Sequence, residues 1–136
     1  MATFNKFNSF VEALAEKVHN LGSDQIVVAL TNTAPNATDT QLSASTQISY
    51  TNLSSRNVTT SSSSQTSGTY KLVLTDLVLT STGGSTGPFR YVVLYNDTAT
   101  NDELIGYYDY GSSLTLAAGE TLTIDFDASN GVLTIA

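Results

Sequence analysis

The chain has 136 residues, of which 40% are hydrophobic, and this combination is typical of one packed globular domain. Its formal net charge is −7, with 12 acidic and 5 basic residues, so it lacks the basic patch that contact with nucleic acid or an anionic membrane requires. It has no cysteine, which excludes disulfide bonds, a thiolate nucleophile and cysteine-ligated zinc.

The first predicted element is one amphipathic helix over residues 4–21, within an N-terminal unit of residues 1–22. Apolar side chains recur there every three or four residues, at Phe4, Phe7, Phe10, Val11, Leu14, Val18 and Leu21. We expect Gly22 to end the helix. The apolar stripe must pack on the chain's own sheet or on a neighbouring subunit, which makes Phe4, Phe7 and Phe10 candidate interface residues. The segment lacks a basic leader and a long apolar run, so we expect no signal peptide and no membrane span.

Residues 23–136 are predicted to form a single β domain. Short runs with period-two apolar alternation, separated by glycine, asparagine, aspartate and serine, favour seven or eight strands. The expected fold class is therefore mainly β, an antiparallel β-sandwich or partly closed barrel with one N-terminal amphipathic helix. The alternation changes phase at Thr75–Asp76, which indicates a β-bulge. The expected strands cover 25–30, 70–74, 77–79, 89–96, 103–110, 114–116, 121–126 and 132–135.

Two long loops are predicted in this domain. The first, near residues 31–47, is rich in Asn, Thr, Ala and Ser, and we expect it to hold one turn of helix and to act as a contact element. The second, near residues 54–68, is rich in serine and is expected to be the most mobile segment.

Two patterns resemble parts of catalytic or metal sites. Residues 83–87, GGSTG, fit the G-x-S-x-G pattern of serine hydrolases, but the residues that follow open a strand rather than a helix. We therefore interpret this segment as a turn. His19 is the only histidine, and a metal site would need further histidine or cysteine ligands, so we expect it to be solvated or at a helix end.

The acidic residues leave two alternatives open. Oxygen ligands that converge from loops hold Ca²⁺ in many proteins, although the chain has no D-x-D-x-D-G loop. A facing pair of carboxylates would instead suit glycoside hydrolysis in an enzyme. We expect no cofactor and no enzymatic activity, with Ca²⁺ as the alternative. The acidic residues concerned are Asp97, Asp102, Glu103, Asp109, Asp125 and Asp127.

Tyrosines concentrate in the last third of the chain. Alternation places Tyr108 and Tyr110 on one face of a strand and Tyr107 on the other. Because tyrosine is stiff and amphipathic, these side chains suit the edge of a core, a subunit contact or a platform on which a sugar stacks. All three are therefore candidate interface residues.

Several sequence stretches carry a resemblance to a known class. They are FNKFNSFVEALAEKVHNLGSD, LTNTAPN, GPFRYVVLYNDT and LIGYYDYGSSLTLAAGETLTIDF. Together they resemble small virion structural proteins of tailed bacteriophages and prophages, most closely the capsid decoration (cement) proteins. The resemblance implies a non-enzymatic protein on the capsid surface of the virion, assembled in the cytoplasm of a bacterial host. Its partners would be the major capsid protein and other copies of itself, as a trimer. The alternatives are a tail-associated structural role and a receptor- or carbohydrate-binding module.

Overall fold

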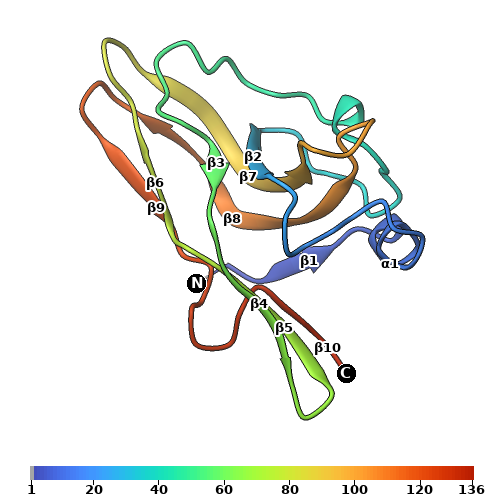
Figure 1. Cartoon of the computed structure of the whole chain (residues 1–136). Helices are drawn as coiled ribbons and strands as arrows, with labels where there is room; N and C mark the ends of the chain where they lie inside the picture. The colour runs from blue at the N-terminus through green and yellow to red at the C-terminus, as the bar shows by residue number, and fades with distance from the viewer. Residues whose placement is uncertain (1) are drawn as a thin grey trace.

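The structure is a computed structural model that describes residues 2–136. Antiparallel β-sheets dominate it, which confirms the predicted fold class, and the sheets do not close into a barrel (Figure 1). The described residues form β1 (Phe4–Lys6), α1 (Ser9–Ala15), β2 (Ile26–Thr31), the 3-10 helix η1 (Leu42–Ala44), β3 (Asn57–Val58), β4 (Thr60–Thr66), β5 (Thr69–Leu74), β6 (Leu77–Thr80), β7 (Thr86–Asn96), β8 (Leu104–Leu116), β9 (Thr121–Ile124) and β10 (Leu133–Ile135).

The strands form three sheets. The largest has the order β1-β8-β7-β2-β3, the second has the order β10-β5-β4, and the third pairs β6 with β9. The long strands β7 and β8 form a hairpin in the middle of the large sheet, and its ladder is interrupted by three register shifts. No helix in residues 2–136 has the length and apolar character that crossing a membrane requires.

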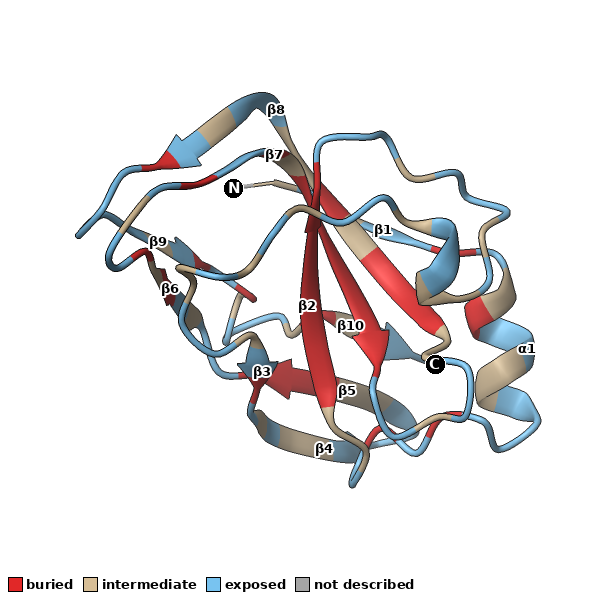
Figure 2. Ribbon diagram, turned by 90° about the horizontal axis from the view of Figure 1, so that it is seen from above, coloured by how far each residue is buried: buried red, intermediate tan, exposed pale blue. Residues whose placement is uncertain are grey.

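The large sheet is buried on both faces at its centre, in β2 and most of β7. All six residues of β2 are buried, which explains why the segment IVVALT is a continuous apolar run rather than an alternating one (Figure 2). One face, with Val28, Leu30, Val92 and Leu94, packs against strands of the two smaller sheets in the main core. The other face carries a second, smaller core that includes Val27, Ala29, Val93, Tyr95 and Leu104.

The segment of residues 32–47 covers this second core. Leu42 of η1 packs on it, and backbone bonds tie the segment to the start of β8, from Leu104 N to Thr40 O (3.1 Å) and from Leu42 N to Asp102 O (3.0 Å). The segment also accepts a bond from Asn8 N at Ala37 O (2.9 Å). The expected turn of helix in this segment is confirmed as η1.

The predicted helix over residues 4–21 is wrong in extent. Phe4–Lys6 is a strand that pairs with β8, and α1 covers only Ser9–Ala15. The free edge of β8 offers Phe4–Lys6 a hydrogen-bonding partner, and this pairing overrides the helical spacing of the apolar residues. The chain leaves the helix through Lys17, whose φ is +68°, and not through Gly22.

Two further predictions about residues 54–76 are wrong. Most of the serine-rich segment is ordered in β3 and β4, because β4 forms a hairpin with β5 and the Ser63 and Tyr70 hydroxyls are 2.7 Å apart. The change of phase at Thr75–Asp76 is not a bulge. The chain there leaves β5 and enters β6 in another sheet, and Asp76 Oδ1 accepts a hydrogen bond from Phe126 N (2.9 Å).

The separate strands expected at 103–110 and 114–116 are one strand, β8. Gly111 lies within it at a φ of +84°, a conformation that glycine adopts without steric cost, so the strand bends without ending. With β1, β3 and β4 added and these two joined, residues 2–136 form ten strands.

Candidate interaction surface

The three phenylalanines proposed as anchors are held by the chain itself. Phe7 is fully buried in the second core, where its ring centroid is 5.3 Å from that of Tyr107. Phe10 is buried in the main core, and Phe4 packs edge-on against Tyr108 with a centroid distance of 5.7 Å. Phe7 and Phe10 therefore have almost no exposed side-chain surface for a neighbour, whereas Phe4 is half-buried; Phe4 and Phe10 both line an open hollow.

The tyrosines of β8 alternate as the sequence predicts. Tyr107 packs on the second core, whereas Tyr108 and Tyr110 lie on the side of the main core. Tyr108 is only 4% exposed. The three rings therefore do not form one exposed platform, so the idea of a sugar stacking across all three is wrong in that form.

Tyr108 and Tyr110 do share a hollow with β9. It has a volume of about 400 Å³, and Leu122, Thr123 and Asp125 line its other side. Burial raises the pKa of Tyr108, and burial followed by the Asp125 carboxylate raises the pKa of Tyr110 to about 12. Both hydroxyls therefore keep their protons at neutral pH and can donate hydrogen bonds to a ligand.

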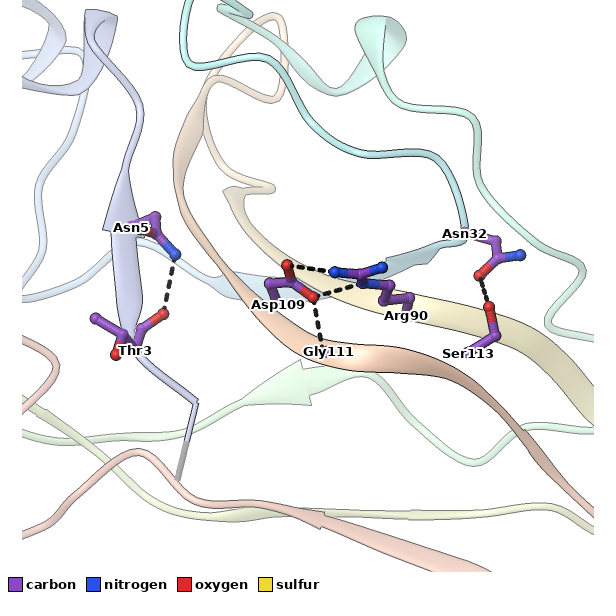
Figure 3. A network of polar contacts seen from close by, with 7 residues as sticks. All are labelled: Thr3, Asn5, Asn32, Arg90, Asp109, Gly111 and Ser113. Carbon is purple, nitrogen blue, oxygen red and sulfur yellow. Dashed lines mark hydrogen bonds and ion pairs between the residues drawn. The ribbon is translucent and has the colours of Figure 1, made fainter.

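One of the predicted acidic ligands is engaged in an ion pair. Arg90 holds Asp109 through two bonds, from Nε to Oδ1 (2.7 Å) and from Nη2 to Oδ2 (3.0 Å) (Figure 3). Gly111 N also donates to Asp109 Oδ1 (2.8 Å). The hydrogen bond from Arg90, then that from Gly111, lowers the pKa of Asp109. The Asp109 carboxylate of β8 therefore links this strand to Arg90 of β7 and to Gly111 of its own strand.

The remaining acids lie in two places, before the start of β8 and between β9 and β10. In residues 2–136 no three histidine, cysteine, aspartate or glutamate side chains gather as a metal site would require. Burial, followed by the carboxylates of Asp97 and Glu103, raises the pKa of Asp102. Asp127 instead accepts bonds from the backbone and side chain of Asn130 (3.1 and 2.8 Å), which form a turn before β10. Ca²⁺ binding stays a prediction.

The GGSTG segment leads into a strand, as expected. Ser85 is exposed and precedes β7, and Gly83 adopts a φ of +80°. Beside it, the buried Ser81 hydroxyl donates to Gly84 O (2.7 Å) and lies 2.8 Å from the Thr86 hydroxyl. The hydroxyl groups of Ser81 and Thr86 therefore stabilise a turn at the start of β7.

His19 forms a buried polar cluster that the sequence did not reveal. It is 4% exposed, so the expected solvated position is wrong. Asn96 Nδ2 lies 3.0 Å from His19 Nδ1 and donates to Asp24 Oδ2 (2.7 Å), while the His19 ring packs on Phe10 with centroids 5.3 Å apart. Asn96 Oδ1 is occupied by the backbone N–H groups of residues 98 and 99. The cluster ties the segment after α1 to the end of β7.

This arrangement also fixes the charge of His19. Because Asn96 Nδ2 carries only hydrogens, His19 Nδ1 must accept, so the ring proton is on Nε2 and the ring is neutral. Burial lowers the pKa of His19, and the carboxylates of Glu103 and Asp24 oppose this shift only in part.

An exposed apolar surface joins α1 to the last strand. Val11 is 53% exposed and Ile135 is 42% exposed, and both line a hollow of about 540 Å³. A neighbouring hollow shares three of the same lining residues, Leu14, Ala15 and Ile135. We define the α1–β10 surface as Val11, Leu14, Ala15, Leu133 and Ile135. It unites residues from opposite ends of the chain, which line the same hollow.

Charged residues lie near the α1–β10 surface. Lys6 and Lys17 border the two hollows, Glu12 is exposed on α1, and Glu16 is exposed directly after this helix. The other three cations of the chain are engaged, Arg90 with Asp109, Arg56 with Val28 O (2.6 Å) and the Tyr50 ring, and Lys71 with Ser129 O (3.1 Å). In residues 2–136, Lys6 and Lys17 are thus the cations without a hydrogen-bonding or ionic partner, and both flank this surface.

Comparison with known proteins finds no match to a family model, to a curated protein or to a solved structure.

Proposed function

We propose that this chain is a non-enzymatic structural protein of a bacteriophage virion, most specifically a head decoration protein that binds the major capsid protein, associates with other copies of itself and stabilises the shell. It would sit on the capsid surface after assembly in the bacterial cytoplasm. The observation that carries the proposal is the α1–β10 surface, an exposed apolar area on a domain whose own two cores are already filled. Such areas mark sites of protein association.

Two other features support this proposal. Three of the four sequence stretches that resemble decoration proteins cover nearly complete elements, namely β1 with α1, β7, and β8 with β9. In addition, two candidate catalytic or metal-binding side chains are engaged in structural roles, His19 in a buried cluster and Asp109 in an ion pair.

The test uses heads of the encoding phage or prophage from which the gene for this chain has been deleted. Purified protein is added, and its co-sedimentation with heads and the temperature of DNA release are measured. We expect saturable binding at a fixed ratio to the major capsid protein and a higher release temperature. Recovery of the chain with tails, or its absence from intact particles, would contradict the head assignment.

A second function, binding to a carbohydrate receptor, is favoured by the hollow that Tyr108, Tyr110 and Asp125 line. Aromatic rings beside a carboxylate suit the apolar face and the hydroxyl groups of a sugar. Under this alternative, a glycan array gives a signal that the Asp125→Asn variant loses and the Val18→Glu variant, altered at an exposed valine that does not line the hollow, retains.

A further inference from the structure

We infer that the α1–β10 surface binds a second copy of this chain across a two-fold axis, with the β10 strands of the two copies paired antiparallel. This inference rests on the self-association in the proposed function and specifies the number of copies. A two-fold interface gives a dimer in place of the trimer that the resemblance implies.

The first observation is the free edge of β10. In the sheet order β10-β5-β4 the strand is terminal, and no residue in 2–136 pairs with its outer side. An edge strand leaves backbone N–H and C=O groups without partners, and natural proteins usually cover or disrupt such edges. Here neither proline nor charge interrupts the edge, whose three residues are Leu133, Thr134 and Ile135.

The second observation is the position of this edge beside an apolar hollow. The residues of β10 line one side of the hollow, and Phe4, Val11 and Leu14 line the other. A strand added to β10 would therefore contact α1 with its side chains while its backbone pairs with the edge. The occupant must be an extended apolar segment, and β10 is itself such a segment.

The third observation is charge. Since Lys6, Lys17, Glu12 and Glu16 balance one another, the rest of the molecule carries the whole net charge of −7. Two copies repel each other over most of their surfaces, whereas two lysines border the hollows of this surface. A two-fold axis at this surface therefore brings together the part of each copy where its unpaired cations lie, and not its acidic remainder.

Together these observations define the interface. Antiparallel pairing centred on Thr134 places each Ile135 side chain in the hollow of the other copy and joins the two β10-β5-β4 sheets into one. Each contact occurs twice, and the assembly closes at two copies, as an isologous interface requires.

The first test measures mass by analytical ultracentrifugation over a range of concentrations. We expect the wild type to reach twice the chain mass of 14.4 kDa. Val11→Glu should weaken the dimer at least about tenfold, because it buries a carboxylate in an apolar contact. The control is Val78→Glu, since Val78 is exposed to the same degree (51% against 53%) but lies on β6, and it should dimerise like the wild type.

The second test uses the absence of natural cysteine. Thr134→Cys places two thiols opposite each other across the axis, within the Cα separation that a disulfide spans. With oxidised glutathione as oxidant, this variant should form a covalent dimer at least about tenfold faster than Val78→Cys. Equal rates for the two variants would overturn the proposed register.

The outcomes separate the two proposals. A monomer at every concentration overturns the two-fold interface, and head binding by that monomer would leave the decoration role in place. A trimer unaffected by Val11→Glu also overturns the interface while it supports the proposed self-association. A dimer that fails to bind heads upholds the interface and removes the decoration role.

Discussion

Protonation of His19 should destabilise the fold between neutral and mildly acidic pH. His19 is the only histidine, is 4% exposed and accepts a hydrogen bond at Nδ1 from Asn96. A second proton would place N–H against N–H₂, and Asn96 cannot rotate its oxygen toward the ring without giving up its bonds to the backbone at residues 98 and 99. Protonation therefore removes this hydrogen bond and charges a buried ring.

The direction and the size of the change in the free energy of unfolding follow from proton linkage. Burial lowers the pKa of His19 in the folded state below its ordinary value of 6.5, so the unfolded chain binds more protons at mildly acidic pH. The stabilisation is complete above pH 6.5 and is lost as the pH falls through the folded-state pKa, by at most about 1.4 kcal/mol per pH unit. The facing carboxylates of Asp24 and Glu103 reduce this loss. Asp102, whose pKa is raised, contributes in the opposite direction as the pH falls.

The assay is urea unfolding of the wild type and of His19→Gln from about pH 7.5 to about pH 5.5, the range in which histidine titrates. A glutamine oxygen can accept the Asn96 hydrogen bond and does not titrate. The difference between the free energies of unfolding of the two proteins therefore does not contain the contributions of Asp102 and the other acids, which both proteins share. We expect the wild type to lose stability relative to His19→Gln as the pH falls. Parallel pH profiles, or an NMR titration of His19 at or above 6.5, would refute the reasoning.

Two predictions concern stability. Phe10→Ala should lower the free energy of unfolding by about 3–5 kcal/mol, because Phe10 is 3% exposed in the main core, and thermal or urea unfolding would measure it. A loss below about 1 kcal/mol would mean that the site collapses around the cavity. Gly131→Ala should cost more than Gly111→Ala, although both glycines have positive φ. A Cβ at position 131 would meet Leu72 O at 2.7 Å, whereas one at position 111 meets no atom within 4 Å. Equal losses, of about 1–2 kcal/mol for the backbone conformation alone, would contradict this steric account.

Most of the β-strands of this fold were predictable because they carry their signal locally, whereas β1, β3 and β4 were missed. The apolar run of β2 and the alternation in β5, β7 and β9 identified those four strands. The N-terminal segment was not predictable in the same way, because the phenylalanine spacing fits a helix while Phe4 and Phe7 pack on opposite faces of a sheet. Only the position of the β8 edge decides between these structures, and that edge lies about 100 residues further along the chain.

The residues of the candidate functional sites also fall into those that the sequence predicted and those that it missed. Tyr107, Tyr108 and Tyr110 were assigned to their faces correctly, since alternation within one strand is a local property. The polar cluster of His19 was missed because its partner Asn96 is 77 positions away. Val11 was visible as part of an apolar stripe, but its exposure follows from the short helix, and its proximity to Ile135 depends on how the two ends of the chain meet.

The segment of residues 32–47 has a practical consequence for anyone who labels this protein. Its composition invites the insertion of an affinity tag or a fluorophore, yet Leu42 and the backbone around it shield Ala29 and Val93 from water. An insertion there would expose the second core of the large sheet to water and would break the backbone hydrogen bonds at the start of β8. The hairpin tip at Ser67–Gly68 is the safer position, because both residues are exposed and a Cβ at Gly68 would meet open space.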